Sequence, residues 1–539
     1  MAIFKKIINK LSSGIAGGAI IISFFSVCSR FLGLFRDHLL AGQFGAGNTL
    51  DAYYAAFKLP DLIFNTLVLG ALNAAFVPIF LEQWSKNKEK AWQIVNSFLN
   101  FLFLALFGLT IIFFIFAPQL VSTVVAPGFD AQTKEVTVSL TRMMLLSILF
   151  FGISNVAGGI LNSFKKFFAY SLAPIMYNLG IIFGILFLVP KLGNLGLAMG
   201  VVLGSFFHLF VQIPSIFKLG YKWEFNFNFY PEVKKIIILM IPRFFALGAS
   251  QVSKLITTII ASTLVTGSLA IYNLADNLQS FPIGIFGISL AISAFPYFSE
   301  CVTNGDLKKF SDHFSLTFRR ILFLIIPSSV LMILLRSQIV RLVLGSGLFS
   351  WRDTALTLNT LGFFVLSLFA QALIPLLARA FYAFQNTKTP LFINIFSIVI
   401  NIFLAIIFGR SMGVAGLALA FSIANIINFI LLFSALRFKA KLLGGKKIII
   451  SLFKITLASI AMIIIVQVSK NFIGTFVDMK TFMGVLIQFI SSSLLGVLAF
   501  LIISFLLKSE EISILNNLFL KRPAIFKNSP PTDSSVDTL

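Results

Sequence analysis

The chain has 539 residues, of which 58% are hydrophobic and 11% charged, a balance that excludes an ordinary soluble domain and is typical of a polytopic membrane protein. Its formal net charge of +23 at pH 7 would indicate nucleic-acid binding in a soluble protein. Here the cations lie mostly in short segments between apolar stretches, as in cytoplasmic loops, so no nucleic-acid partner is predicted.

Apolar stretches follow one another along the chain, each about 20 residues or longer and therefore able to cross about 30 Å of hydrocarbon. We expect an all-α polytopic membrane protein with about 14 transmembrane helices. The expected spans are approximately 14–36, 51–82, 92–117, 136–163, 170–190, 195–217, 236–264, 269–298, 316–340, 356–382, 390–409, 413–436, 449–468 and 484–507. Lys5, Lys6 and Lys10 precede the first span as in a signal peptide, but no small-residue cleavage site follows, so we expect an uncleaved span.

Six charged residues lie in the first hydrophobic hairpin. They are Arg30, Arg36, Asp37, Asp51, Lys58 and Asp61. An arginine at bilayer depth costs several kcal/mol unless it faces water or a partner, so an ionisable residue there indicates a functional site. A guanidinium stays charged at cellular pH, and its planar fork matches a phosphate. The hairpin therefore predicts a wet, cationic cavity that receives an anion.

The six residues support the prediction of a cavity to different degrees. Arg30 lies about 16 residues into the first span, too deep to reach a membrane surface easily, whereas Arg36 could instead snorkel to the outer surface beside Asp37. Asp51 and Lys58 are seven positions apart on one helix face. They either line the cavity or form an ion pair with one of the arginines.

Loop cations predict the orientation of the chain. With the N-terminus in the cytoplasm, the cytoplasmic segments hold roughly three times as many lysines and arginines as the opposite loops. Both termini are therefore expected in the cytoplasm. The segment 521–539 is rich in proline, serine and aspartate, which predicts a disordered cytoplasmic tail.

The sequence also repeats itself at a spacing of 216–221 residues. Ala75–Glu82 resembles Ala294–Glu300, and Gly193–Ala198 resembles Gly413–Ala418. Repeats in the same order favour a duplication into two pseudo-symmetric lobes of six helices each. Transporters built from parallel repeats bind substrate between the lobes near mid-membrane and alternate access by rocking one lobe against the other.

The duplication predicts three parts. They are an N-lobe at 1–220, a C-lobe at 235–437 and two additional helices at 448–508. In the C-lobe, Arg243 and Lys254 lie at a depth comparable to the arginines of the first hairpin, and pseudo-symmetry would place Lys254 across the cleft from Arg30.

Few features indicate an enzyme. No nucleotide-binding glycine loop, metal-binding acid pair or Ser/His/Asp set is present, and no cofactor is expected. The two cysteines, Cys28 and Cys301, support neither a disulfide framework nor a metal site. The histidines His38, His208 and His313 are scattered without ligand spacing, so we interpret them as isolated polar side chains.

Four segments resemble the N-terminal signature of the MurJ/MviN family of lipid II flippases. They are Ser29–Asp37, Phe44–Gly47, Asp51–Pro60 and Ala75–Phe80. The resemblance implies a fourteen-helix member of the multidrug/oligosaccharidyl-lipid/polysaccharide exporter superfamily in the bacterial plasma membrane, and we expect a monomer. Such a protein moves lipid II, the undecaprenyl-pyrophosphate disaccharide-pentapeptide used in peptidoglycan synthesis, from the inner to the outer leaflet. Its last two helices shape a groove for the prenyl tail.

The resemblance also implies site residues. Arg30 and Arg36 match the family's first-helix arginines, and Asp37, Asp51 and Lys58 match other charged cavity positions. The family commonly has arginines where this chain has Phe64 and Asn277. We hypothesise that Lys254, together with Arg243, supplies the missing positive charge.

Two alternatives stay within the superfamily: a flippase for another polyprenyl-diphosphate-linked glycan, and a multidrug-type exporter. An exporter of hydrophobic cations would need an acidic cavity, which the arginine-led hairpin disfavours. From other classes, a membrane scaffold needs no buried arginines, and a membrane glycosyl transferase needs metal-binding acids.

Overall fold

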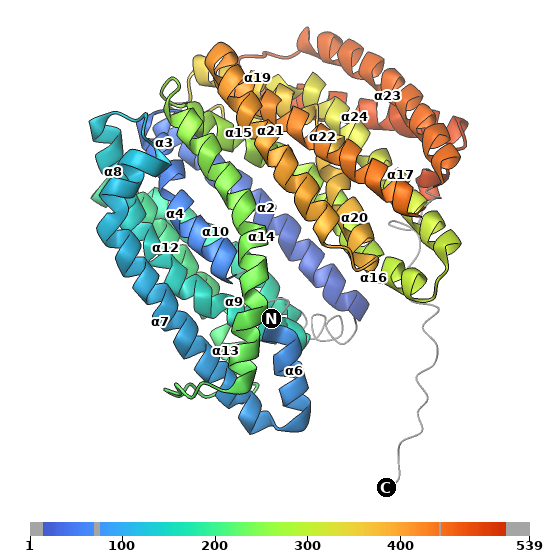
Figure 1. Ribbon diagram of the computed structural model, residues 1–539. Helices are drawn as coiled ribbons and strands as arrows, with labels where there is room; N and C mark the ends of the chain where they lie inside the picture. The colour runs from blue at the N-terminus through green and yellow to red at the C-terminus, as the bar shows by residue number, and fades with distance from the viewer. Residues whose placement is uncertain (1–14, 69–75, 441–443, 514–539) are drawn as a thin grey trace, which may run out of the picture.

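The computed structural model describes residues 15–68, 76–440 and 444–513, and every regular element within these ranges is helical (Figure 1). The N-terminal lysines and the tail at 521–539 lie outside the described residues, as do the side chains of 15–20 and 242–247. Within the described residues, ten helices are long and apolar enough to span a membrane, or eleven if one pair bent by 43° is counted as a single span. The chain is an all-α, multi-pass membrane protein.

The first half of the chain begins with α2 (Ile15–Phe44). It continues with α3 (Asn48–Ala56), α4 (Lys58–Ile63), η1 (Phe64–Val68), α6 (Val77–Lys86), α7 (Lys88–Leu120), η3 (Val121–Val125), α8 (Ala131–Leu145), α9 (Ser147–Ser163), α10 (Phe167–Phe183), η4 (Gly184–Leu188), α11 (Val189–Leu192), α12 (Leu195–Phe210) and α13 (Ile213–Phe217). We call α3–α13 the N-terminal group.

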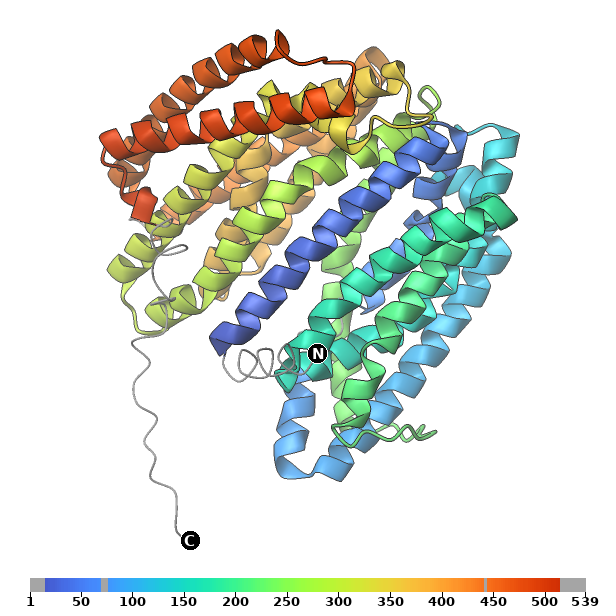
Figure 2. The same cartoon turned by 180° about the vertical axis from the view of Figure 1, so that it is seen from behind.

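The second half begins with α14 (Pro231–Ser262). It continues with α15 (Ser268–Pro282), η5 (Ile283–Ile288), α16 (Ser289–Thr303), α17 (Leu307–Leu334), α18 (Arg336–Val343), α19 (Trp351–Val365), α20 (Leu368–Ala383), α21 (Lys388–Met412), α22 (Val414–Ala440), α23 (Gly445–Gly474), α24 (Phe482–Leu506) and η6 (Glu510–Ile512). We call α15–α22 the C-terminal group and α23–α24 the terminal hairpin. Figures 1 and 2 show α2 and α14 running between the two groups.

Capping side chains set where several helices begin. The side chains of Asn87, Asp130, Asp306 and Thr481 each accept a hydrogen bond from a backbone N–H three residues further on. Ser350 forms a full capping box at the start of α19. These polar caps satisfy N–H groups that the first turn of a helix leaves free.

Three expected spans are broken, and one of them, 356–382, contains the 43° bend between α19 and α20. The stretch 51–82 is divided into α3, α4, η1 and α6, and its first break lies at Phe57, three residues before Pro60, whose ring disfavours an uninterrupted helix. The stretch 316–340 is also divided, because α17 ends at Leu334 and α18 begins at Arg336. The polar α18 carries Arg341, which donates to the Met479 carbonyl, so this segment does not continue the apolar span.

Glycines let α12 pack closely on α10 and on η4, which continues α10. A Cβ added to Gly180 would lie 2.3 Å from Gly204 Cα, and a Cβ added to Gly184 would lie 2.4 Å from Gly200 Cα. Small residues spaced four apart allow membrane helices to approach backbone to backbone. The α10–α12 pair therefore forms a rigid wall of the N-terminal group, against which α2 packs.

Certain backbone irregularities recur at the spacing of the sequence repeat, although two other π-helical segments, η3 and η4, occur in the first half alone among the described residues. The π-helical segments η1 and η5 occupy Phe64–Val68 and Ile283–Ile288. Gly193 and Gly413 end their helices with nearly the same dihedral angles, φ 57° and ψ −141° against φ 62° and ψ −142°. Both halves thus place the same irregularities at equivalent positions.

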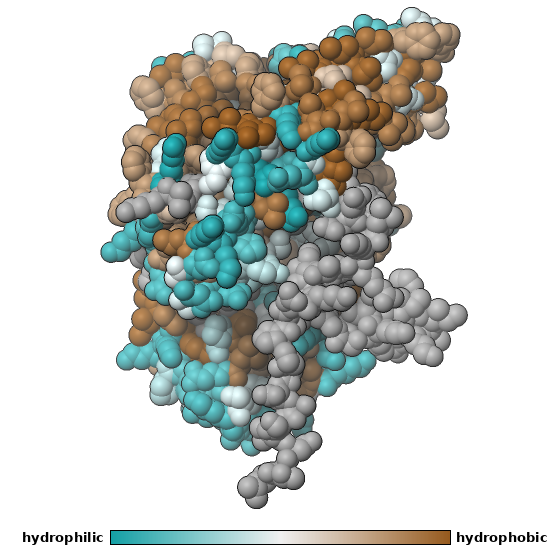
Figure 3. All heavy atoms as spheres, turned by 90° about the vertical axis from the view of Figure 1, so that its right-hand side faces the viewer, coloured by the Kyte–Doolittle hydropathy of each residue, from teal (hydrophilic) through white to brown (hydrophobic). Residues whose placement is uncertain are grey.

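The terminal hairpin packs on the C-terminal group through α17 and α18. At one end of this contact Arg319 of α17 forms ion pairs with Glu510 and Glu511, and Ser451 of α23 also donates to Glu511. Arg319 and Glu511 are only 6% and 1% exposed, and a buried charge pair is costly to break. Figure 3 shows hydrophobic residues across the upper part of this side of the molecule and hydrophilic residues below.

The two halves of the chain, α2 with the N-terminal group and α14 with the C-terminal group, are joined at the end of the molecule uppermost in Figure 1, which we call the closed end. Leu348 N donates to the Gly42 carbonyl at 2.8 Å, and Gly128 N donates to Ser262 Oγ at 3.2 Å. Ala46 N also donates to Asp353 Oδ2 at 3.4 Å. At the opposite end, α6 and α16 lie apart in both ribbon views (Figures 1 and 2).

Candidate functional site

A small cavity of about 120 Å³ lies between α2 and α15. Arg30, Gly33, Leu34, Arg36, Asp37, Asn277, Ser280 and Phe281 line it. The structure therefore brings three of the predicted site residues together, at the contact between the long first helix and the C-terminal group.

Arg36 is neutralised within its own helix. Its guanidinium lies 2.8 Å from Asp37 Oδ1 and also donates to Asn178 Oδ1 of α10 at 3.3 Å. The other Asp37 oxygen accepts a 2.9 Å hydrogen bond from Asn277 of α15. This chain of contacts links α10, α2 and α15, so Arg36 and Asp37 connect both groups. Sequence reasoning did not identify Asn178, and it noted Asn277 only as a position without a family arginine.

The positive charge of Arg30 is not paired in this way. Its guanidinium donates only a long 3.4 Å hydrogen bond to the Ser280 carbonyl, and no carboxylate lies within ion-pair distance of it among the described side chains. Gly284 of η5 lies so close that an added Cβ would be 1.9 Å from Arg30 Nη2. Arg30 is thus a partly exposed cation that packs against the backbone of a glycine. It is able to pair with the anionic group of a ligand.

A second charged cluster lies on α4, α14 and α15. Lys58 and Lys254 each interact electrostatically with Asp61 and Asp276, and Asp276 also accepts a 2.8 Å hydrogen bond from Gln279. The cluster has two positive and two negative members, so its net charge is zero. Lys254, expected opposite Arg30, lies in this cluster with an exposed side chain.

The remaining predicted residues lie elsewhere. Asp51 is 4% exposed, and its two oxygens accept from Gly267 N at 2.6 Å and Ala270 N at 2.8 Å. It forms these bonds, and not the ion pair with Arg36 or Arg30 that we considered. The side chain of Arg243 lies outside the described residues. A substrate role for either residue stays a prediction.

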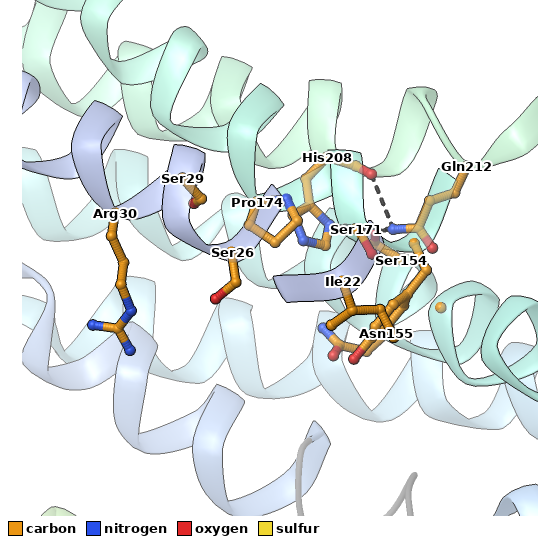
Figure 4. A pocket seen from close by; sticks show the side chains of 12 residues that line it. Ile22, Ser26, Ser29, Arg30, Ser154, Asn155, Ser171, Pro174, His208 and Gln212 are labelled. Atoms are coloured by element: carbon orange, nitrogen blue, oxygen red, sulfur yellow. Dashed lines mark hydrogen bonds between the residues drawn. The ribbon is translucent and has the colours of Figure 1, made fainter. Parts of the chain in front are cut away.

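A larger cavity of about 440 Å³ adjoins Arg30 on the side of the N-terminal group (Figure 4). Its lining includes Ser26 and Ser29 of α2, Ser154 and Asn155 of α9, Ser171 of α10, His208 of α12 and the adjacent Gln212. His208 Nδ1 lies 2.6 Å from Ser154 Oγ, to which Gln212 Nε2 donates at 2.7 Å. His208, interpreted from the sequence as isolated, therefore belongs to a hydrogen-bonded network.

The arrangement suits an amphipathic anion. Arg30 borders both cavities and supplies the unbalanced positive charge, while the larger, polar cavity leaves room beside it for an uncharged group. A planar guanidinium binds phosphate oxygens in bidentate fashion.

Comparisons of the sequence with known proteins identify the same family. The family model described as "Lipid II flippase MurJ" matches residues 40–487. The probable lipid II flippase MurJ of Thermotoga maritima is 32% identical over 485 residues, which cover 90% of this chain and 95% of the relative. The corresponding protein of Buchnera aphidicola subsp. Baizongia pistaciae is 31% identical over 467 residues, which cover 84% of this chain and 89% of the relative.

Solved structures give the same result. A lipid II flippase MurJ in an inward closed conformation superposes with a TM-score of 0.76 at 29% identity, covering 93% of this chain and all of that one. An inward-facing multidrug resistance transporter of the MATE family, in the MOP superfamily, gives a TM-score of 0.66 at 17% identity and covers 78% of this chain and 98% of that one. The second likeness concerns the fold alone.

Proposed function

The chain belongs to the lipid II flippase MurJ family, and from this premise we propose that it carries lipid II across the bacterial plasma membrane, from the inner to the outer leaflet. The family is one of transporters, and we propose that this chain too moves its cargo without chemical change. The cargo is amphipathic, with a diphosphate joining a long prenyl tail to a glycan and peptide.

Arg30 is the observation that carries this proposal. A guanidinium without a carboxylate partner among the described residues, held between α2 and η5 beside two cavities, is costly in a membrane protein unless an anion binds it. A diphosphate has the charge and the oxygen geometry to do so. In this proposal Arg36, already paired with Asp37, keeps α2 in place.

The helices described above support a finer architecture. We propose fourteen spans, in which α2 and the N-terminal group form one six-helix lobe and α14 and the C-terminal group form a second. The backbone irregularities that occur in both halves support such a duplication. The terminal hairpin would add two spans and, with its exposed apolar surface, shape a groove for the prenyl tail. We further propose a monomer.

Alternating access follows from that architecture. Because loop cations predict both termini in the cytoplasm, the closed end would face outward, and the diverging ends of α6 and α16 would face the cytoplasm. The headgroup would enter from the cytoplasm, bind at Arg30, and leave once the contacts of Gly42, Ala46 and Asp51 break and the lobes rock. The tail would remain in lipid throughout.

Growth complementation tests the function and the contribution of Lys254 together. Expressed in a bacterium depleted of its own lipid II flippase, the chain should restore growth, and Lys254→Ala should restore it less well because the charged cluster on α4, α14 and α15 loses its exposed cation and is left with an excess of carboxylates. Failure of the parent chain to complement at equal expression would contradict the proposed cargo. Full complementation by Lys254→Ala would remove Lys254 from the site.

A further inference from the structure

We propose that the larger cavity, between α2, α9, α10 and α12, is a subsite for the neutral sugar joined to the diphosphate. This inference rests on the proposed function and extends it, because it assigns the glycan a binding place of its own. The ligand class is an uncharged, hydroxyl- and amide-bearing ring.

The position of the cavity is the first argument. Arg30 lies at one end of it and Gln212 at the other, as Figure 4 shows. Arg30 also borders the small cavity between α2 and α15. A diphosphate bound at Arg30 would therefore have its attached sugar directed into the adjoining space. The volume lies within the range of about 300–1,000 Å³ that is typical of small-molecule sites.

Two orphaned polar atoms are the second argument. Ser171 Oγ and Gln212 Oε1 are buried without a hydrogen-bond partner among the described residues, although both residues line the cavity and are 6% and 1% exposed. A buried polar atom without a partner is destabilising and calls for an explanation. We infer that rotation of either side chain would turn its oxygen toward the cavity, where a ligand hydroxyl or amide could bond it.

The chemistry of the lining is the third argument. Apart from Arg30 at its edge, the lining carries no arginine, lysine, aspartate or glutamate among the described residues, so nothing in it would stabilise a second ionic group. Gln212 donates to Ser154 Oγ, the Ser154 hydroxyl can then donate to His208 Nδ1, and Nε2 of the neutral ring is left as a donor. Tyr170 adds an aromatic ring, 39% exposed, for the apolar face of a sugar.

Ser171→Ala tests the subsite with little risk to folding, because the hydroxyl removed has no partner among the described residues. The full chain is reconstituted in nanodiscs and titrated with lipid II and, separately, with undecaprenyl diphosphate, which has no sugar. We expect Ser171→Ala to bind lipid II about 3- to 10-fold more weakly, the loss of one hydrogen bond. Its affinity for undecaprenyl diphosphate should match that of the parent chain.

Ser459→Ala is the matched control, since Ser459 of α23 is also buried without a described partner but does not line the cavity. It should bind both lipids as the parent does. An unchanged lipid II affinity in Ser171→Ala, or an equal loss for both lipids, would overturn the subsite. If the parent chain binds undecaprenyl diphosphate but gains nothing from the glycan, the subsite fails while the diphosphate site stands. If it binds neither lipid, the proposed function itself fails.

Discussion

Arg30 and Arg36 lie on one helix but have different surroundings. Arg36 has its charge balanced by Asp37 at 2.8 Å and is held by Asn178. Arg30 contacts only a backbone carbonyl and the glycine of η5. These surroundings support the proposal that Arg30 binds the anion and that Arg36 positions α2 between α10 and α15.

Gly284→Ala tests whether the position of the Arg30 guanidinium matters. The new Cβ would lie 1.9 Å from Nη2, so the guanidinium must move by roughly 1.5 Å or more to reach a normal contact distance. We expect lipid II transport in proteoliposomes to fall at least about tenfold, because small displacements of a binding group are costly. The melting temperature should change little, since a flexible side chain can yield.

Gly108→Ala provides the comparison, because a Cβ added there meets no atom within 4 Å. It should transport at the parental rate. Parental transport by Gly284→Ala, at a melting temperature equal to the parent's, would show that the exact place of the guanidinium is unimportant.

The sequence predicted the charged residues of the candidate site but not the uncharged ones. Arg30, Arg36 and Asp37 stand out because charge is costly at bilayer depth, and the structure does gather them at one cavity. Ser154, His208 and Gln212 give no such signal, because isolated polar residues are common in membrane helices. Their network depends on the packing of α9 against α12, which no local pattern encodes.

At the scale of elements, the start of α15 is fixed by the other half of the molecule. Asp51 of α3 accepts from the backbone N–H groups of Gly267 and Ala270, in the manner of a capping residue, and a carboxylate also suits the positive end of a helix dipole. Because these partners belong to a distant part of the chain, the sequence indicated a charged cavity residue and not a cap.

Asp51→Ala should therefore weaken the closed end. Loss of the cap costs about 0.5–2 kcal/mol. If the cap breaks when the groups separate, its loss shifts the equilibrium between joined and separated groups roughly 2- to 30-fold toward separation. Spin labels on the exposed residues Gln132 and Arg352, with Cys28 and Cys301 replaced by serine, would report this by electron–electron double resonance. We expect a longer-distance population in Asp51→Ala.

Asp130→Ala is the control, because Asp130 caps α8 within the N-terminal group. It removes a cap of the same kind without touching the contact between the groups. If Asp51→Ala gives the parental distance distribution, the cap does not hold the closed end, and a substrate role for Asp51 becomes the better explanation.

The sequence predicted where apolar spans occur better than how they are broken. Hydropathy measures length and composition, so the span beginning at 92 appears as α7 and the span beginning at 195 as α12. The π-helical segments and the break at Phe57 depend on hydrogen bonding and packing across helices, which average hydropathy does not detect. The position of η5 matters most, since it places Gly284 beside Arg30.

At the scale of the whole molecule, the repeat detected in the sequence has a counterpart in the backbone, where η1 and η5, and Gly193 and Gly413, occupy matching positions. The proposed duplication would account for the position of α2 against both groups and for the candidate site at their contact. Under this proposal, transport requires the two groups to move as units, with the closed end opening as the other end closes.

The most direct measurement is the rate at which fluorescent lipid II is flipped in proteoliposomes by the parent chain, Arg30→Ala and Arg142→Ala. Arg142 is the control because its guanidinium bonds the Phe114 carbonyl and lies over that ring, away from both cavities. We predict that Arg30→Ala flips at least about tenfold more slowly and that Arg142→Ala flips like the parent. Equal rates for Arg30→Ala and the parent would contradict the account.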